Sequence, residues 1–446
     1  MKSNVDLLHG DITKSIIKYA LPIFLANCFS ELYNITNSLI VGNFISTKAL
    51  SAVSACTWIC NIFNYTFYGL GLGAGILVAN LYGANKKDKL KQAMDTSIVF
   101  GVCGGIVLTI ISETFLPLLM RACNIAPDIY NDALQYLRVY LLGNTCVLTY
   151  QMCFFIMRSF GDSKHPLYYL ILSSIINMSL GVIFVRVLHM SVVGTALATI
   201  ISQLVVDILS LRLLFNYDGL KFDIHNIDFS LETVGRICEL GLPAGIQNML
   251  IAISSMLVQS YVNLFPNEVI AGIGVAEKSA VWGQMPSLAL SSASTSFISQ
   301  NYGAKQYDRL KQGIRKILII STISTSIMVA AVLITAPNIV ALFNDNPEVI
   351  YHGSRMCRII AVSFLSLNLS HIYNGACRAT GNVRAPMLIA VASQVICKYL
   401  FVLIGLKIKF CVEVLYCASA VGYGFAGIFA TIYFHTSNKV KESNLR

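Results

Sequence analysis

Long apolar stretches of helical length, separated by short polar segments, run along the whole chain. A helix needs roughly 20 apolar residues to cross a membrane, and twelve stretches reach that length. They cover residues 15–41, 49–81, 92–117, 130–157, 166–186, 190–212, 237–262, 268–300, 317–341, 350–376, 386–406 and 412–435. This pattern predicts an all-α integral membrane protein with twelve transmembrane helices.

The apolar pattern and its loops repeat after about 220 residues. The loop NLYGANKKDKLKQ, which begins at Asn80, recurs as QNYGAKQYDRLKQ, which begins at Gln300. Each half holds six stretches, an even number, so both halves enter the membrane from the same side and the repeat is parallel. We therefore expect two pseudo-symmetric six-helix lobes, at 1–212 and 237–446, joined by a cytoplasmic linker at 213–236.

Composition and charge support this membrane assignment. Residues of the types AVILMFWYC make up 56% of the chain and DEKR only 12%, with a mean hydropathy of +0.67, which is too apolar for a soluble protein of this length. The net charge is +10, and most of the 32 Lys and Arg lie in segments on the same side as the N-terminus. This asymmetry predicts that both termini are cytoplasmic. The basic residues are spread over many short loops, so they do not indicate nucleic-acid binding.

The first segment, MKSNVDLLHGDITKS, has no short apolar core of the kind found in signal peptides. We therefore expect it to remain in the mature protein. The 13 cysteines mostly lie inside apolar stretches without paired spacing. This distribution favours reduced, buried thiols over a disulfide framework.

Polar side chains form one face of the first stretch, between Leu21 and Phe44, and the opposite face is apolar. The polar face comprises Asn27, Ser30, Glu31, Tyr33, Asn34, Asn37 and Ser38. A carboxylate inside a membrane is costly, which marks Glu31 as a functional candidate. For Asn27, Ser30 and Ser38, hydrogen bonds to neighbouring helices are the simpler explanation. Other acids lie near the ends of stretches, where their side chains can reach water: Asp95, Glu113 and Asp207.

The second half places Glu277 and Lys278 in the stretch 268–300 and Lys398 in the stretch 386–406. Glu277 is therefore a second candidate for ion coupling. We expect Glu277 to pair with Lys398, either in a functional site or as a purely structural contact between two helices. Gln284 can hydrogen-bond a ligand or a neighbouring helix.

The chain lacks the motifs of catalysis and of nucleotide binding. Its seven histidines are nowhere within four residues of one another, and it contains no G-x-x-x-x-G-K-[ST] loop. No arrangement of Ser, Cys or paired carboxylates indicates an enzyme, and no cofactor is expected. A twofold-repeated bundle with polar residues in its lobes is instead typical of a secondary transporter that works by alternating access.

Several segments resemble the multidrug and toxic compound extrusion (MATE) transporters, over nearly the whole chain. They are ELYNITNSLIVGNF, ANLYGANKKDKLKQA, RSFGDSKHP, GTALATIISQ, LGLPAGIQN, ISQNYGAKQYDRLKQ and CRATGNVRAP. The resemblance implies two six-helix lobes around a central cavity. It also implies export of amphipathic, usually cationic compounds in exchange for H⁺ or Na⁺.

Two positions depart from the prokaryotic pattern of this family. Asn37 stands where the pattern has an Asp in the first span, and Gly181 stands where it has an Asp four residues after Asn177. Other polar positions around that ion site match: Tyr33, Asn34, Asn177 and Thr199. An Asn cannot take up and release a proton, so we hypothesise that Glu31 replaces the missing acids. The alternative is that Glu31 is a packing residue and that the first lobe has lost its coupling.

Together these features predict a monomeric exporter in a bacterial plasma membrane, which moves small molecules by rocking two lobes about a central cavity. Its candidate cavity residues are Asn27, Tyr33, Asn34, Asn37, Asn177, Thr199, Lys278, Gln284 and Lys398. Two alternatives stay open. The lysines of the second lobe favour an anionic or lipid-linked cargo on the same architecture, and the lost carboxylates are compatible with a membrane scaffold that transports nothing.

Overall fold

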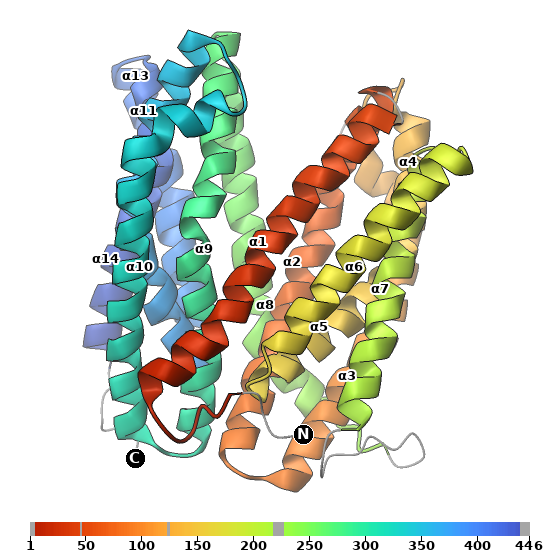
Figure 1. The fold of residues 1–446 in the computed structure, drawn as a ribbon, viewed down its shortest axis with the longest axis vertical. Coiled ribbons are helices and arrows are strands. Elements are labelled where there is room, and N and C mark those ends of the chain that lie inside the picture. Colours follow the sequence, from red (N-terminus) through yellow and green to blue (C-terminus); the bar gives the residue numbers. More distant parts are fainter. Residues whose placement is uncertain (1–4, 45–46, 123–124, 217–226, 438–446) are drawn as a thin grey trace. The chain divides into compact units, whose positions relative to one another are not determined.

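The structure is a computed structural model that describes residues 5–44, 47–122, 125–216 and 227–437. The side chains of residues 34–50 and 122 lie outside this description. Within the described part, every regular element is a helix (Figure 1). The all-α prediction is therefore confirmed.

Helices in the first half of the chain are α1 (Ile12–Phe44), α2 (Thr47–Gly83), α3 (Lys87–Ala122), α4 (Tyr130–Leu142), α5 (Asn144–Ser159), α6 (Lys164–Val182), the π-helical η1 (Ile183–Val187) and α7 (Val192–Phe215). Those in the second half are α8 (Leu231–Val262), α9 (Asn267–Gly303), α10 (Tyr307–Ala341), α11 (Pro347–Ala379), α12 (Arg384–Ala390), the π-helical η2 (Val391–Cys397), α13 (Lys398–Ile408) and α14 (Val412–Thr436). Each of the twelve predicted stretches falls on one helix or on consecutive helices.

Ten described helical spans are long and apolar enough to cross a membrane, and the bent pair α4 and α5 makes an eleventh. The remaining long helix is α9, which has 37 residues but carries Glu277, Lys278 and a serine-rich second half. The stretch 130–157, predicted as one helix, bends by 45° where α4 meets α5 at Gly143. At Gly143 an added Cβ would lie 2.9 Å from the side chain of Ile200. The close approach of α7 therefore requires a glycine at the bend.

The internal repeat is visible in the backbone. Non-glycine residues with positive φ lie in the loops after α2 and α9, at Asn85 (φ 54°) and Lys305 (φ 57°). Glycines with positive φ follow α5 and α11, at Gly161 (φ 80°) and Gly381 (φ 88°). Each pair is separated by the 220 residues that the sequence alignment predicts. The two halves therefore share their turn geometry as well as their helix order.

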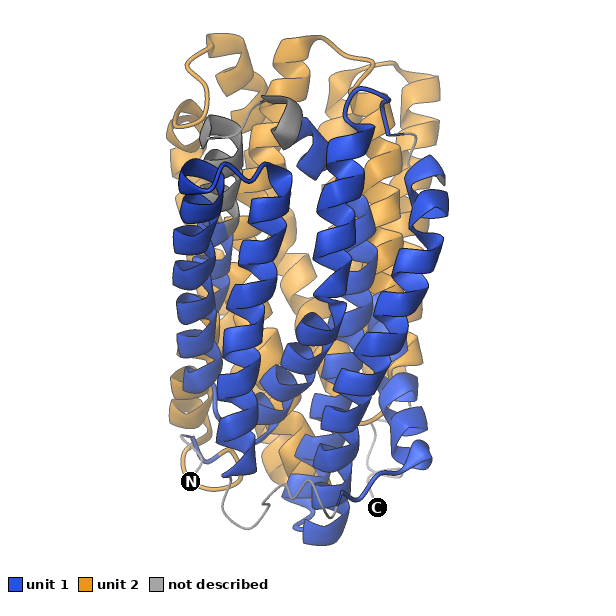
Figure 2. Cartoon of the chain, turned by 90° about the vertical axis from the view of Figure 1, so that its right-hand side faces the viewer, with its two compact units in different colours: residues 1–6, 25–245 blue, residues 7–24, 246–446 orange. Residues whose placement is uncertain are grey.

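The chain divides into two compact units, coloured in Figure 2. Unit 1 contains residues 25–245 together with the first six, and unit 2 contains residues 7–24 and 246–446. The division falls inside α1 and inside α8, at positions that correspond in the repeat. Each of these two helices thus contributes its first part to one unit and its remainder to the other.

Glycines of α2 bring three helices of unit 1 into close contact. A Cβ added at Gly73 would lie 2.4 Å from the carbonyl oxygen of Ile237 on α8, and one at Gly69 would lie 2.6 Å from that of Gly241. On another face of α2, a Cβ at Gly71 would lie 2.7 Å from the ring of Phe155 on α5. The glycine-rich segment is therefore a packing surface, which holds α5 and α8 close to α2.

The last described part of the linker is attached to α3. Asp228 N donates to Asp95 Oδ2 at 3.3 Å, and Gln92 Nε2 donates to Asp228 Oδ1 at 2.9 Å. Asp95 is only 2% exposed. The expectation that Asp95 reaches water is therefore wrong, because the linker covers its carboxylate.

Candidate functional site

The polar face of α1 is only partly described. Asn27, Glu31 and Tyr33 are half-buried residues of unit 1. The side chains of Asn34 and Asn37 lie outside the described residues, so their predicted places on this face stay a prediction.

A buried hydrogen-bond network of unit 1 connects α6, α7 and the polar face of α1. Asn177 on α6 is 4% exposed, and its Nδ2 donates to Thr199 Oγ1 at 3.0 Å and to Ser202 Oγ at 3.5 Å, both on α7. Tyr33 hydrogen-bonds to the Thr199 side chain. Thr199 Oγ1 also donates to the carbonyl oxygen of Thr195 at 3.0 Å. The structure thus brings together Tyr33, Asn177 and Thr199, which the sequence placed on three separate spans.

An open space lies next to this network. Gly181 is buried on α6, one helical turn after Asn177, and a Cβ added there would meet no atom within 4 Å. Residues four apart lie on the same face of a helix. Gly181 therefore leaves unfilled the place where the family pattern has a carboxylate.

Further polar side chains near Tyr33 are not evident from the sequence. Tyr136 and Tyr140 of α4 stack with ring centroids 5.8 Å apart, and both interact electrostatically with Tyr33. Asn64 Nδ2 on α2 donates to Tyr140 Oη at 3.3 Å. The i, i+4 spacing of the two tyrosines was the only available signal, and aromatic pairs at that spacing are common in apolar cores.

The side chains named in this network are amides, hydroxyls and phenols. Their neutral oxygens can coordinate a hard cation such as Na⁺, whereas amides and aliphatic hydroxyls do not titrate at physiological pH. The network can therefore bind an ion, and proton exchange needs an acid from outside it.

The candidate residues of the second half lie in unit 2. Lys398 begins α13 directly after the π-helical η2, and it is 8% exposed. Its Nζ donates to Ser255 Oγ on α8 at 3.4 Å. π-helical segments are rare and frequently occur at functional sites.

Glu277 interacts electrostatically with Lys398, but the described side chains form no direct ion pair between them. The two charges therefore interact as expected, but without a direct ion pair, and Lys398 contacts the hydroxyl oxygen of Ser255. Glu277 and Lys278 are both exposed on α9. Gln284, also on α9, donates to the carbonyl oxygen of Ala280 at 3.4 Å and interacts with Tyr423 of α14.

A second correction concerns Asp207, which the sequence placed near a helix end with access to water. It is 4% exposed, inside the contact between α5 and α7. Distance along a helix does not reveal this burial, because a neighbouring helix provides it.

Comparisons with known proteins agree with this architecture. Residues 22–183 and 243–404 each match the family model MatE. The chain is 27% identical to the probable multidrug resistance protein YoeA of Bacillus subtilis, over 85% of this chain and 84% of that protein. It is 24% identical to the multidrug export protein MepA of Staphylococcus haemolyticus, over 88% of this chain and 87% of that protein.

Solved structures show the same fold. One is an outward-facing multidrug resistance MATE family transporter of the MOP superfamily, with a TM-score of 0.92 and 21% identity over 100% of this chain and 99% of that one. Another is a MOP superfamily transporter from Pyrococcus furiosus, described as having a binding pocket of reverse polarity that suggests a different function. Its TM-score is 0.90, with 20% identity over 98% of each chain.

Proposed function

Because the chain belongs to the MatE family of membrane transporters, which are not enzymes, we propose that it is a secondary active exporter of amphipathic, cationic small molecules. Export proceeds by alternating access of the two six-helix lobes and is driven by exchange for H⁺ or Na⁺. The protein works as a monomer in a bacterial plasma membrane, with both termini in the cytoplasm. The distribution of Lys and Arg supports this orientation.

The observation that carries the proposal is the network of Tyr33, Asn177 and Thr199 inside unit 1. A scaffold has no need of a buried oxygen cluster beside an open space at Gly181, whereas an ion-coupled carrier uses both. Because the named members of the network do not titrate as acids, Glu31 supplies the proton site of the first lobe, and Glu277 supplies that of the second.

A second candidate cargo is an anionic or lipid-linked molecule. Lys398 supports it, since a buried ammonium group without a carboxylate in direct contact attracts an anion. The exposed Lys278 adds to the same local positive charge. A Pyrococcus transporter of the same fold is described as having a binding pocket of reverse polarity that suggests a different function.

The experiment uses the purified chain in proteoliposomes, with ethidium as a cationic probe and a carboxyfluorescein-type dye as an anionic probe. Efflux is followed under an imposed pH gradient and, separately, an imposed Na⁺ gradient, with and without a protonophore. We expect ethidium export that collapses with the driving gradient. Anionic dye export without ethidium export selects the second cargo, and no movement of either probe under any gradient contradicts both proposals.

Glu31→Gln and Glu277→Gln identify the coupling residues. The variant that removes the true site abolishes the dependence of export on the gradient. Lys278→Gln is the matched control, because it changes one exposed charge next to Glu277 and leaves both acids in place. If both acid variants retain the gradient dependence, neither residue couples export to the ion.

A further inference from the structure

Asp207 is a buried acid inside unit 1. It is 4% exposed, and among the described residues no Lys or Arg forms an ion pair with it. Cys146 of α5 and Gln203 of α7 approach the carboxyl group, yet its Oδ1 has no hydrogen-bond partner. A charged carboxylate in such a place is costly, and a buried acid commonly becomes neutral by binding a proton.

Polar groups without hydrogen-bond partners gather around this acid. Ser210 Oγ is buried, lacks a partner and lies on the same face of α7 as Asp207. Gln203 lies one turn earlier on this face, and its side chain contacts the Asp207 carboxyl group. The hydroxyl of Tyr150 on α5 is likewise buried without a partner, and it interacts electrostatically with Asp207. Buried polar atoms normally have partners, so several unpaired ones in a single place indicate a site for water or a mobile proton.

The titratable groups that interact directly with Asp207 all lie on α5: Cys146, Tyr150 and Cys153. The described side chains of α4 and α6, which also pack against α7, add none. Arg158, at the end of α5, interacts with Tyr150, and its guanidinium lies over the ring of Phe154 at 4.9 Å.

A route from Tyr150 leads to the end of the helices that the charge distribution places in the cytoplasm. Tyr150 interacts with Tyr169 of α6, whose hydroxyl donates to the carbonyl oxygen of Leu209 at 3.3 Å. Tyr169 also lines a surface cleft of about 440 Å³ together with Leu209, Arg212, Leu213 and Asn216. The α7 residues of this cleft lie on the face of the helix opposite to Asp207. Tyr150 and Tyr169, on α5 and α6, therefore form the proposed connection between Asp207 and the cleft.

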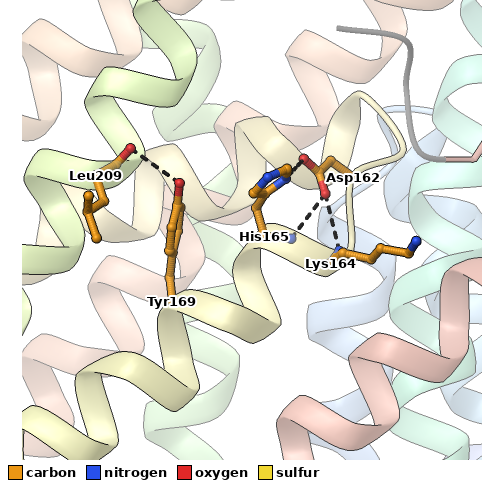
Figure 3. A network of polar contacts seen from close by, with 5 residues as sticks. All are labelled: Asp162, Lys164, His165, Tyr169 and Leu209. Atoms are coloured by element: carbon orange, nitrogen blue, oxygen red, sulfur yellow. Dashed lines mark hydrogen bonds and ion pairs between the residues drawn. The ribbon is translucent and has the colours of Figure 1, made fainter.

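The loop before α6 holds a group of polar contacts near Tyr169, as Figure 3 shows. Asp162 accepts hydrogen bonds from the backbone N–H groups of Lys164 at 3.2 Å and His165 at 3.1 Å, and it pairs with the His165 ring. The His165 ring lies 6.0 Å from that of Tyr169, measured between centroids. The polar groups of this loop therefore lie next to Tyr169.

The repeat provides an internal comparison. The position 220 residues after Asp207 is Gly427 on α14, and the position 220 residues after Cys146 is Ser366 on α11. A Cβ added at Gly427 would lie 2.2 Å from Ser366 Oγ. The same helix crossing is thus built in the second half without any side chain at this position. The fold does not need an acid at this helix crossing, so the presence of Asp207 in the first half indicates a function.

We infer that Asp207 is an intramembrane protonation site of the first lobe that exchanges its proton with the cytoplasm through the Tyr169 cleft. The inference rests on the proposed export function and adds a proton site outside the Tyr33–Asn177–Thr199 network. Polar residues continue from Asp207 along one face of α7 to Thr199, eight residues or about 12 Å away. A proton on Asp207 and an ion at the network can therefore influence each other through this one helix.

The first test needs no variant. The full chain in liposomes is treated with dicyclohexylcarbodiimide, which traps protonated carboxyl groups in apolar surroundings, and labelled peptides are quantified by mass spectrometry across a pH series. We expect label at Asp207 that falls roughly tenfold per pH unit above its midpoint. Asp88, which is exposed at the start of α3, is the unlabelled control. No label at Asp207, or label that is independent of pH, overturns the inference.

The second test compares Asp207→Asn with Asp95→Asn, which alters another strongly buried acid of unit 1. We expect Asp207→Asn to lose the pH dependence of ethidium efflux, Asp95→Asn to keep it, and Tyr169→Phe to slow labelling of Asp207. Wild-type efflux with a pH profile that Asp207→Asn leaves unchanged refutes the inference alone. If the wild-type chain exports no probe, the proposed function fails, and the labelling experiment still decides whether Asp207 exchanges protons.

Discussion

Gly181→Asp tests whether the first lobe has lost only a side chain or also the space for it. An added Cβ at this buried position meets no atom within 4 Å. Asn177 lies four residues earlier on the same face of α6 and hydrogen-bonds to Thr199. The new carboxyl group is therefore expected to enter the open space next to the oxygen network without displacing a helix.

The cost in stability follows from three contributions. Replacing glycine in a helix interior by aspartate contributes about 0.3 kcal/mol, and a hydrogen bond to Asn177 at i, i+4 spacing contributes about 0.2–0.5 kcal/mol. An incompletely hydrogen-bonded buried carboxyl group costs about 1–3 kcal/mol. The net loss in the free energy of unfolding is about 0–2.5 kcal/mol, which a protein of ordinary stability tolerates.

The assay measures ethidium efflux from proteoliposomes as a function of pH, in the Glu31→Gln background. We expect Gly181→Asp to change the pH profile of export there, because it adds a titratable group beside the network to the sites at Asp207 and Glu277. Gly181→Asn and Gly181→Ala fill the same space without titrating and serve as controls. If Gly181→Asp and Gly181→Asn give the same pH profile, or if only the aspartate variant fails to fold, the reasoning about this space is refuted.

Three further predictions concern packing, a helix start and charge selectivity. Gly73→Ala would place a Cβ 2.4 Å from a carbonyl oxygen of α8 and should lower the free energy of unfolding by about 1–3 kcal/mol. The control Gly274→Ala, whose added Cβ meets no atom within 4 Å, should not lower it. Equal melting temperatures of the two variants would contradict this prediction. Asp11 accepts a hydrogen bond from Lys14 N at 2.7 Å, and this bond lowers the pKa of Asp11 below its usual 3.8. The stabilisation of the start of α1 by the Asp11 carboxylate is therefore complete above pH 3.8, and it is lost as the pH falls through the lowered pKa. Asp11→Ala should therefore speed amide hydrogen exchange in the first turn of α1 at neutral pH, with a difference that disappears in acid; a difference that persists in acid would rule out the carboxylate as its cause. Lys398→Gln should lower the half-saturating ethidium concentration roughly tenfold if a cation approaches the buried ammonium group, equivalent to about 1.4 kcal/mol, and an unchanged value would place the cargo away from it.

Much of the fold could be predicted because lipid imposes strict requirements on a chain. A span must be long, apolar and helical, so the apolar stretches locate the helices, and a repeat of loops locates the symmetry. The bend between α4 and α5 escaped prediction, because Gly143 looks like any glycine until Ile200 of α7 approaches it. The positive φ of Lys305 escaped as well, because lysine rarely adopts this conformation.

The candidate site was predictable only where polar residues stand on one helix face. Tyr33 and Thr199 meet as the resemblance implied. The roles of Tyr136 and Tyr140 depend on which helix faces them, and a single sequence does not contain that information. For the same reason the sequence led to the wrong prediction that the Asp207 side chain reaches water. Its burial comes from α5 and not from its own helix.

The two halves share a backbone but carry different ionisable groups, and this asymmetry bears on how the work of transport is divided. Lys398 corresponds to Met178 in the first half, and Asp207 corresponds to Gly427 in the second. The first lobe thus combines neutral oxygens with a buried acid, a chemistry suited to cations and protons. The second has a buried ammonium group on α13, directly after a π-helical segment. Under the proposed exchange, we therefore expect the charge of the cargo to be sensed in the second lobe, and the buried acid of the first lobe to add a proton site that the second lobe lacks at the corresponding position.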